Sequence, residues 1–398
     1  MELTPGLRRD AGPDLDAVGQ DDALVARIED EIGRAGPIAF ARFMELALYD
    51  PAGGYYRAAA ARPGHDGDFL TAPETHPIFG AALARGLEEV WEHLGRPDPF
   101  VLREYGAGTG TLALAILERL ELDGSGLARV IRYDPIEVEP RRLQTLAERL
   151  GALGRSDFMF DPGSSGQTIV GAILGNEVLD ALPTHRVVVR DGRLLEILVG
   201  SRDGRFTDVE AAPTTPALAA RLADEGIALA DGQRAEICLD LEPWIAHAAT
   251  GMERGLLLLI DYGYPAPELY DPVRRRDGTL RAYLRQRVHD DPYRHIGRQD
   301  LTAHVDVTAV ERAAAAAGLV HLGTTTQAEF LVGLGTQELL QAIQADPATT
   351  LEVYLAVRSA VMRLLDPGAM GRFRVMGFAR DWADGPPLAG FAYRLGAR

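Results

Sequence analysis

The chain has 398 residues and contains no lysine, because all 41 of its basic residues are arginine. This absence excludes three kinds of mechanism: a Schiff base with a carbonyl substrate or pyridoxal phosphate, a lysine of a phosphate-binding loop, and the catalytic lysine of a protein kinase. Asparagine is almost as scarce, since Asn176 is the only one. The abundance of alanine, arginine and glycine indicates a GC-rich genome, and codon drift alone accounts for both scarcities.

Long apolar runs and cysteine pairs are also missing. Apolar runs such as residues 256–260 are far shorter than the roughly 20 residues of a membrane span, so we expect no transmembrane helix. The first 34 residues carry nine acidic residues and four arginines, unlike a secretory signal or a transit peptide. Cys238 is the sole cysteine, which excludes an intrachain disulfide and a cysteine-rich zinc site. We therefore expect a bacterial protein of the cytoplasm.

Positive charge is scarce overall, with 41 basic against 58 acidic residues and a formal net charge of -17. Because nucleic-acid binding needs a clustered positive surface, we expect no DNA or RNA partner. Residues 271–298 differ from the rest, with eight arginines and four aspartates. This segment could bind an acidic protein or a carboxylate substrate through bidentate arginine contacts, or it could be a solvated loop paired with the chain's own acids.

The length suggests two or three packing units, at about 150 residues per domain. Apolar spacing predicts helices over residues 24–32, from Pro37 to 48, and from Pro77 onward. The boundaries that we expect are as follows: a loose arm (1–20), a mainly helical region with a lid loop (21–100), the first part of an α/β domain (101–183), a hairpin-containing insertion (184–250), and the remainder of the α/β domain (251–398) with a substrate-side loop (264–303).

Beyond residue 100, short apolar strands alternate with amphipathic helices, which is typical of a parallel α/β domain. The strands are predicted at residues 101–105, 129–138, 168–174 and 255–263, and near 319–324 and 373–378. A helix is predicted over 306–317. Between Thr184 and Pro243 the pattern changes, and Asp191-Gly192 predicts a two-residue hairpin turn between antiparallel strands.

The most informative motif is EYGAGTGT, which starts at Glu104 and lies between a predicted strand and a predicted helix. Gly106, Gly108 and Gly110 let the backbone approach a nucleotide-like ligand, and Glu137 ends the next strand, where its carboxylate can accept both ribose hydroxyl protons. The dinucleotide fingerprint has the spacing G-x-G-x-x-G, whereas this spacing is G-x-G-x-G. Glu104 would repel a diphosphate but suits the cationic, amino-acid end of S-adenosylmethionine. The motif therefore favours S-adenosylmethionine over a nicotinamide dinucleotide.

Six segments, taken in order, resemble the MidA-like family of class I methyltransferases, which includes a mitochondrial assembly factor for respiratory complex I. They are GDFLTAPE (67–74), EYGAGTGT (104–111), GNEVLDALP (175–183), DYG (261–263), GTLRAY (278–283) and DLTAHVD (300–306). The resemblance spans roughly residues 22–335. It implies an α/β fold, the class I methyltransferase (Rossmann-like) seven-stranded sheet with a helical N-terminal region and an antiparallel insertion, and S-adenosyl-L-methionine as the cofactor.

The resemblance also implies which residues bind the donor. Gly106, Gly108 and Gly110 would wrap its amino-acid and ribose end, and Glu137 would hold the ribose. The GDFLTAPE segment could fold over the donor as a lid, with the carboxylates of Asp68 and Glu74 and the hydroxyl of Thr71 reaching the methionine ammonium, and we favour this interpretation. The alternative is a capping loop, in which Thr75 or His76 satisfies the first amides of the next helix.

Asn176 and Glu177 follow a predicted parallel strand, at the edge where open α/β sheets bind ligands. We expect Asn176 to contact donor and acceptor, and Glu177 to offset the charge of the acceptor, with Asp180 as a second catalytic candidate. An arginine acceptor, with a pKa above about 12, favours fixed carboxylates over histidine. In the alternative interpretation, Asp180 caps and Asn176 satisfies a turn.

Two further groups of residues each have two interpretations. Asp261-Tyr262-Gly263 either faces the same site or only ends a strand in a turn. His304 and Asp306 could bind a metal, but methyl transfer from a sulfonium needs none, so we expect no metal site and interpret the pair as a helix cap with its hydrogen-bonded partner.

These patterns predict an S-adenosylmethionine-dependent methyltransferase. Because mitochondrial members of the resembling family are associated with methylation of a protein arginine, we favour a protein side chain, arginine first, as the acceptor. The alternatives are a small-molecule O- or N-methyltransferase of secondary metabolism, a non-catalytic assembly factor that binds S-adenosylmethionine and, least favoured, a nicotinamide dehydrogenase. The oligomeric state stays open, with a homodimer as one option.

Overall fold

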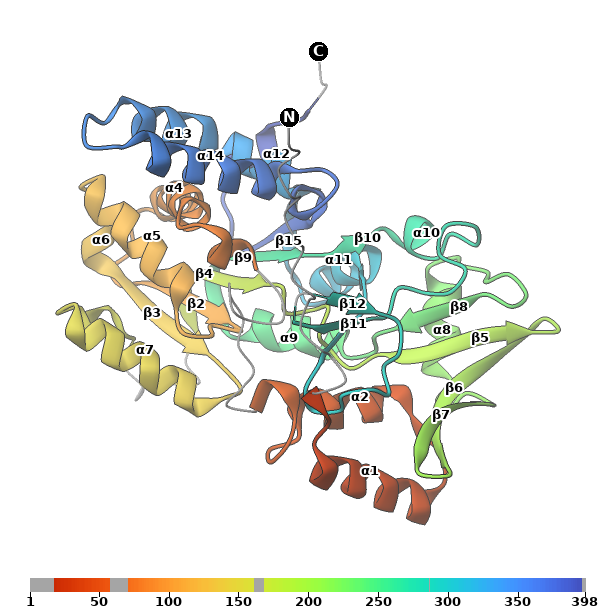
Figure 1. Cartoon of the computed structure of the whole chain (residues 1–398). Coiled ribbons are helices and arrows are strands. Elements are labelled where there is room, and N and C mark those ends of the chain that lie inside the picture. The colour runs from red at the N-terminus through yellow and green to blue at the C-terminus, as the bar shows by residue number, and fades with distance from the viewer. Residues whose placement is uncertain (1–17, 58–70, 161–167, 286, 396–398) are drawn as a thin grey trace, which may run out of the picture.

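A mixed six-stranded sheet forms the centre of the protein in the computed structural model, which describes residues 18–57, 71–160, 168–285 and 287–395. The strand order is β15-β16-β9-β4-β2-β3 (Figure 1). β9, β4, β2 and β3 are parallel, whereas β16 is antiparallel to both of its neighbours. The strands are β2 (Phe100–Tyr105), β3 (Ile131–Ile136), β4 (Ile169–Asn176), β9 (Met252–Asp261), β15 (Val320–Thr326) and β16 (Arg374–Arg380).

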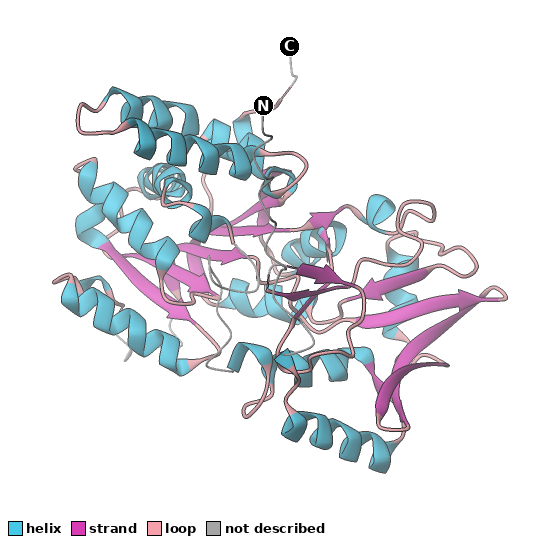
Figure 2. Ribbon diagram, in the orientation of Figure 1, coloured by secondary structure: helices cyan, strands magenta, loops and turns pink. Residues whose placement is uncertain are grey.

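Helices cover this sheet on both faces (Figure 2). The main ones are α4 (Ile78–His93), α5 (Thr111–Leu122), α7 (Pro140–Ala152), α9 (Leu241–Thr250) and α11 (Val307–Ala316). In β9, Leu256 and Leu258 belong to the core that contains α4 and α5, whereas Leu257 and Leu259 belong to the core that contains α9 and α11. Successive side chains of a strand point to opposite faces of the sheet, and helices cover both faces here. A buried parallel strand is therefore a continuous run of apolar residues.

The predicted strands are present with shifted ends, but the expected seventh strand is not found among the described residues. Beside β3, where a seventh strand would pair, the structure has a single bridge between Tyr133 and Met159. The chain there forms a short 3-10 helix, Ser156–Phe158, and Phe158 stacks on Tyr133 with 5.5 Å between ring centroids. The Phe160 N–H also donates to the carbonyl oxygen of Tyr133 at 2.8 Å, and residues 161–167 lie outside the described ranges, so the structure describes six strands of this sheet and the seventh stays a prediction.

A second, antiparallel sheet contains the predicted hairpin. Its strands are β1 (Ile38–Ala39), β5 (His185–Arg190), β6 (Arg193–Arg202), β7 (Arg205–Ala211) and β8 (Arg234–Ile237). Asp191 and Gly192 join β5 to β6 with φ of 49° and 72°, which confirms the two-residue turn.

The N-terminal region packs against this second sheet through α1 (Asp22–Ala35), α2 (Phe40–Tyr49) and β1. The prediction that the second helix starts at Pro37 is wrong, because Ile38 and Ala39 pair with β6 and α2 begins at Phe40. This pairing joins segments that lie about 160 residues apart, as the partners Ile38 and Val199 show.

Two segments contain more regular structure than the sequence indicated. The expected loop over residues 264–303 includes a small sheet, because its arginine-rich part pairs with residues near Asp300. The C-terminal region adds helices that pack over α4 (Figure 1). The additional elements are β10 (Gly263–Tyr264), α10 (Ala266–Leu269), β11 (Arg281–Leu284), β12 (Arg287–His289), β13 (Asp300–Thr302), β14 (Val305–Asp306), α12 (Gln327–Gly333), α13 (Thr336–Ala345), α14 (Leu351–Leu365) and α15 (Ala389–Ala392). Among the described helices, none is long and apolar enough to cross a bilayer.

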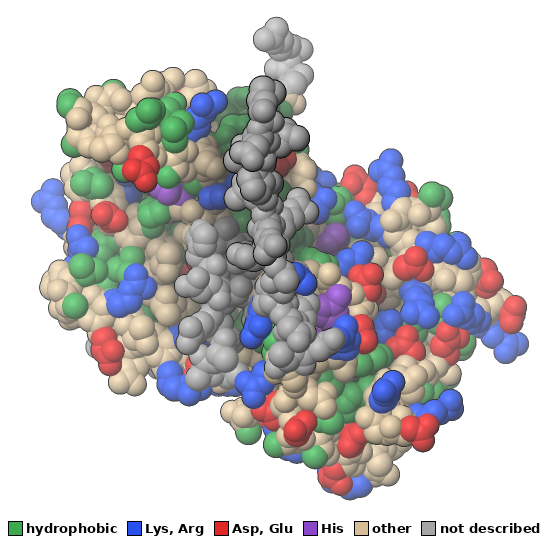
Figure 3. All heavy atoms as spheres, in the orientation of Figure 1, with side chains coloured by type: hydrophobic (Ala, Val, Ile, Leu, Met, Phe, Trp, Pro, Cys, Tyr) green, Lys and Arg blue, Asp and Glu red, His purple; other side chains and the backbone are tan. Residues whose placement is uncertain are grey.

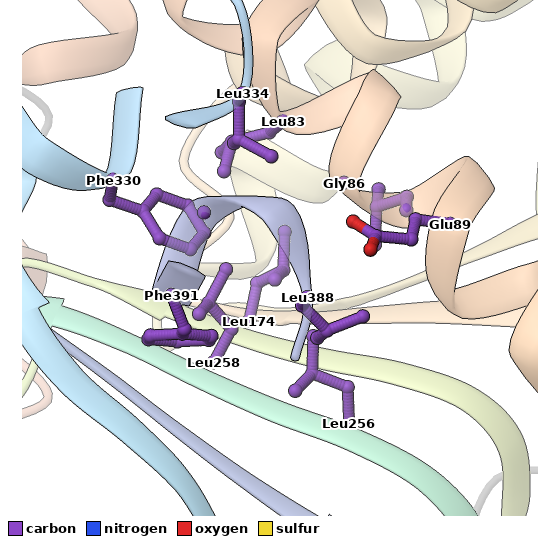
Figure 4. A pocket seen from close by; sticks show the side chains of 12 residues that line it. Leu83, Gly86, Glu89, Leu174, Leu256, Leu258, Phe330, Leu334, Leu388 and Phe391 are labelled. Atoms are coloured by element: carbon purple, nitrogen blue, oxygen red, sulfur yellow. The ribbon is translucent and has the colours of Figure 1, made fainter. Parts of the chain in front are cut away.

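A small apolar cavity lies between α4, the central sheet and α15 (Figure 4). Leucine and phenylalanine side chains from these elements and from α12 point into it, among them Leu174, Leu258, Phe330 and Phe391. Gly86 of α4 also lines the cavity, and a methyl group added there would lie 3.2 Å from Cδ2 of Leu334. Leu334 lines the same cavity and therefore has room to shift.

We expect Gly86→Ala to raise the free energy of unfolding by about 0.5 to 1 kcal/mol, because alanine stabilises a helix interior relative to glycine. The matched control is Gly80→Ala in the same helix, where the new Cβ would lie 2.6 Å from Cβ of Ala115 in α5. This overpacking should lower the free energy of unfolding by about 1 to 3 kcal/mol. Denaturant unfolding measures both changes, and a shift of the same sign in both variants would contradict the expectation.

Candidate functional site

The glycine turn between β2 and α5 has three glycines with left-handed φ: 70° at Gly106, 54° at Gly108 and 75° at Gly110. A Cβ at Gly110 would overlap Cδ1 of Leu146 in α7, whereas a Cβ at Gly108 would meet no atom within 4 Å. A Cβ at Gly106 would touch Cγ2 of Val178 at 3.0 Å. Gly110 therefore permits close packing with α7, and Gly108 faces space that a ligand can fill.

Glu137 lies against this turn, as the sequence predicted from its place after the second strand. Its carboxylate accepts hydrogen bonds from the N–H of Gly108 at 2.8 Å and from the Arg142 guanidinium at 3.1 Å. Glu104, at the end of β2, is buried and accepts a hydrogen bond from the Tyr133 hydroxyl at 2.6 Å. Burial raises the pKa of Glu104 to about 8, and the nearby charge of Glu137 adds to the increase.

Glu177 directly follows β4 in a left-handed conformation, with φ of 53°, which is uncommon for a residue other than glycine. Three donors fix its carboxylate: the N–H of Ala72 at 3.1 Å, Nδ2 of Asn176 at 3.1 Å and the hydroxyl of Tyr262 at 3.2 Å. Burial raises its pKa to about 7, and Asp261 contributes. Oδ1 of Asn176 is buried and accepts no hydrogen bond from the described residues. An unpaired buried acceptor of this kind suits a ligand that donates.

Asp261, at the end of β9, holds the turn that follows Glu177. Its Oδ2 accepts hydrogen bonds from the N–H groups of Val178, Leu179 and Asp180 at 3.1, 2.8 and 3.3 Å. Oδ1 accepts from the N–H of Tyr262 at 2.8 Å. Of the two interpretations of the DYG motif, these contacts support a structural role for the carboxylate, while Tyr262 reaches Glu177.

Asp180 is buried beside three other carboxyl groups, those of Asp261, Asp300 and Glu177. Burial is the main cause that raises its pKa, and the three neighbouring charges raise it further. Asp300, in β13, was not singled out from the sequence. It accepts a hydrogen bond from the Tyr56 hydroxyl at 2.8 Å, a contact across 244 residues. Its place in the DLTAHVD motif was the only signal that could have found it.

The N-terminal region supplies phenol groups near these carboxylates. Tyr49 donates a hydrogen bond from its hydroxyl to the carbonyl oxygen of Ala181 at 3.0 Å, and it stacks on Tyr56 with 5.4 Å between centroids. Neither ring has a role in the expectations drawn from the sequence. Because the partners lie far along the chain, local patterns do not reveal these contacts.

The proposed lid is described only from Thr71 onward, so Asp68 lies outside the described residues. The Thr71 hydroxyl donates to Oε2 of Glu74 at 2.9 Å, at the start of the short helix α3 (Ala72–Thr75). His76 accepts the N–H of Ile78 on Nδ1 at 3.0 Å, as the capping interpretation anticipated for that histidine. The lid role of Asp68 and Thr71 stays a prediction, and the contact of the Ala72 N–H with Glu177 places the end of this segment beside the candidate site.

Asp306 is the N-cap of α11 and accepts the N–H of Ala309 at 3.1 Å, which agrees with the capping interpretation. His304 stacks against Tyr262 with 6.4 Å between centroids. Burial lowers the pKa of His304 to about 3, and the nearby Arg275, Arg372 and Arg281 contribute.

The parallel strands, the glycine turn and the facing acid after the next strand define a Rossmann-like α/β protein with a site for a nucleotide-like ligand. Residues 82–325 match the family described as "Putative S-adenosyl-L-methionine-dependent methyltransferase", and the chain belongs to this family. It is thus an S-adenosylmethionine-dependent methyltransferase with S-adenosylmethionine as its cofactor, as the resemblance to the MidA-like family predicted.

Individual relatives agree with this assignment. The chain is 29% identical to "Protein arginine methyltransferase NDUFAF7 homolog, mitochondrial" of Drosophila melanogaster, over 93% of this chain and 89% of that one. Its identity to the Homo sapiens protein arginine methyltransferase NDUFAF7 is 28%, over 86% and 79%. The crystal structure of a COG1565 superfamily member from Burkholderia thailandensis, bound to S-adenosyl-homocysteine, is 34% identical, with a TM-score of 0.84 and coverage of 96% and 97%.

Proposed function

We propose that the chain transfers a methyl group from S-adenosylmethionine to the guanidinium of a protein arginine. The observation that carries this proposal is the pair of carboxyl groups next to the ends of β4 and β9, the buried Asp180 and the half-buried Glu177. Buried acids without a cation are costly, so a site of this kind favours a cationic acceptor. The names of the relatives as protein arginine methyltransferases support the same acceptor.

The residues of the glycine turn fit the donor. Gly108 borders open space, and Glu137 contacts the N–H of Gly108. Glu104 is a buried acid that a cationic amino-acid group would stabilise. In this proposal, donor binding involves Gly106, Gly108, Gly110, Glu104, Glu137, Asn176 and Thr71, together with Asp68. Bound S-adenosylmethionine supplies an electrophilic methyl group on a positively charged sulfur.

Glu177 is the proposed catalytic carboxylate, with Asp180 and Asn176 beside it. A free arginine has a pKa above about 12, so the acceptor arrives as a cation and must lose a proton when its nitrogen forms the new N–C bond. A carboxylate with its pKa raised to about 7 is a better base than a solvated one. Glu177 would accept the guanidinium proton, and Asp180 would stabilise the remaining charge. Holding donor and acceptor in line can supply about 7 to 11 kcal/mol of barrier reduction.

The direct test uses donor labelled in its methyl group and a cell extract separated into protein and small-molecule fractions. We expect the label in the protein fraction, and methylarginine after acid hydrolysis. The Glu177→Gln variant should give little of either. Label in the small-molecule fraction would support the small-molecule methyltransferase instead, and donor binding without any transfer would support a non-catalytic factor.

Donor affinity should depend on pH through Glu104. Its pKa is about 8 without a cationic partner, and an ammonium group beside the carboxylate would lower that pKa, so binding should release a proton. Affinity is therefore expected to fall as the pH decreases below about 8, by at most tenfold per unit. Calorimetry in buffers of different ionisation enthalpy, between about pH 6 and 7.5 where the donor amine stays charged, measures the release. Glu104→Gln should bind more weakly and without proton release, and a wild-type protein that releases none would contradict this role.

A further inference from the structure

Arg275, Arg281 and Arg372 lie near His304, and Arg374 lies over the neighbouring Tyr264 ring. We call these four residues the arginine rim. Nη1 of Arg275 lies 3.2 Å from Nδ1 of His304, and its guanidinium lies 3.9 Å from the centroid of the Tyr264 ring. Arg374 lies over the same ring at 5.8 Å. Arg275 and Arg281 come from the arginine-rich segment 271–298, whereas Arg372 lies just before β16 and Arg374 at its start. Figure 3 shows basic side chains beside histidine side chains in the middle of the molecule.

The ring of Tyr262 connects Glu177 with His304, near which the rim lies. Tyr262 donates its hydroxyl hydrogen bond to Glu177 and stacks on His304. On another side, the Tyr262 ring packs against Phe373 with 4.1 Å between centroids. Arg372 and Arg374 flank Phe373 in the sequence, so they directly adjoin the ring that packs against Tyr262.

Among the residues that the structure describes, few acids pair with the rim. Arg374 is 3.9 Å from the Glu268 carboxylate, and Arg281 is 3.4 Å from that of Asp290, whose side chain is 83% exposed. Exposed ion pairs of this kind contribute little free energy to stability. Arg372 is exposed and forms no ion pair in the described part of the chain. This positive cluster stands out in a protein with a net charge of -17. Burial raises the pKa of Tyr283, Asp180 and Asp300 add to the increase, and Arg281 and Arg372 oppose it, so the rim and the buried acids act on the same hydroxyl.

We propose that the arginine rim binds carboxylate side chains that flank the acceptor residue, so that the enzyme selects acceptors within acidic protein segments. This inference rests on the proposed function and adds its substrate class. The acceptor's cation would enter among Glu177, Asp180 and Asp300, while neighbouring carboxylates pair with the rim through bidentate contacts. The chain's strong negative charge disfavours a nucleic acid at the same surface, since a long phosphate backbone would meet repulsion around the rim.

The test compares three peptides of equal length with a central arginine flanked on both sides by glutamate, glutamine or lysine. The rim variant is Arg281→Glu with Arg372→Glu. The control variant is Arg202→Glu with Arg205→Glu, which makes the same change in charge at exposed positions next to the β6–β7 turn. Fluorescence anisotropy measures peptide binding to protein saturated with S-adenosylhomocysteine, and labelled donor measures methyl transfer.

For the wild type and the control, we expect the glutamate peptide to bind about tenfold or more tightly than the glutamine peptide, with a preference that weakens in salt. In the rim variant this preference should disappear, and the lysine peptide should bind best. Donor affinity should remain unchanged in both variants.

The two measurements separate this inference from the proposed function. If the glutamate peptide binds more tightly through the rim but receives no methyl group, the rim binds acidic segments, and the proposal that arginine is the acceptor is contradicted. Methyl transfer at equal rates to all three peptides would support the proposed function and overturn the inference about the rim. Equal affinities, no measurable binding of any peptide, or displacement of the glutamate peptide by an oligonucleotide at lower concentration would also overturn it.

Discussion

Gly108→Leu is expected to abolish measurable binding of S-adenosylmethionine while the chain stays folded. A Cβ at Gly108 meets no atom within 4 Å, so the leucine side chain would fill the space that we assign to the donor. The left-handed backbone, with φ of 54°, costs a leucine about 1 to 2 kcal/mol, which is small against a typical total stability of about 5 to 15 kcal/mol. We expect at least a hundredfold weaker binding, or about 2.7 kcal/mol. Calorimetric titration measures the affinity, and thermal unfolding measures the fold.

Two other glycines provide matched controls. Gly124 has φ of 64° and also meets no atom within 4 Å, but it lies at the far end of α5. Gly124→Leu therefore carries the same backbone cost, and donor affinity should be unchanged. Gly110→Leu should instead destabilise the fold, because its side chain overlaps Leu146. Wild-type affinity in Gly108→Leu would overturn the placement of the donor at this turn.

Most of the central sheet could be predicted from the sequence because its determinants are local. Helices cover both faces of the sheet, so each strand is a short run of apolar residues, as in residues 256–260. Glycine-rich turns separate the strands from the helices. The positive φ angles of Asp191 and Gly192 follow from residue type in the same way. The helical spacing of Val357, Val361 and Leu364 in α14 was also readable, although the sequence analysis did not assign that helix.

The site itself depends on contacts that no local pattern contains. Glu177, Asp261 and Asp300 come from three segments, and Tyr56 reaches Asp300 across 244 residues. The arginine rim likewise joins residues near 280 with residues near 373. Helix α2 starts late for the same reason, since pairing of Ile38 with a distant strand overrides the local preference for a helix after proline. The expected seventh strand came from family resemblance, and it stays a prediction, because the described residues show only a bridge between Tyr133 and Met159 at that edge of the sheet.

Glu177→Gln should spare donor binding and reduce the rate of methyl transfer by about 10² to 10⁴-fold, the range typical for loss of a positioned acid or base. Glutamine has nearly the same shape and can still accept the N–H of Ala72, so the local backbone should persist. At acceptor concentrations well below saturation, the wild-type rate should rise with pH through about 7 and then level, because it reports the free enzyme, in which the deprotonated carboxylate is the active form. The variant should lack this rise. Single-turnover rates between about pH 6 and 9 measure both effects.

A structural role of Glu177 would produce a different result, because this carboxylate also fixes the start of α3 through the Ala72 N–H. Glu74→Gln separates the two roles, since Glu74 belongs to the same short helix and glutamine can replace glutamate in its capping box. We expect this variant to keep a wild-type rate and pH profile. If both variants lost transfer equally, the position of α3 rather than the charge of Glu177 would control the reaction. A loss confined to Glu177→Gln, with the pH rise removed, would identify the carboxylate as the group that takes the acceptor's proton.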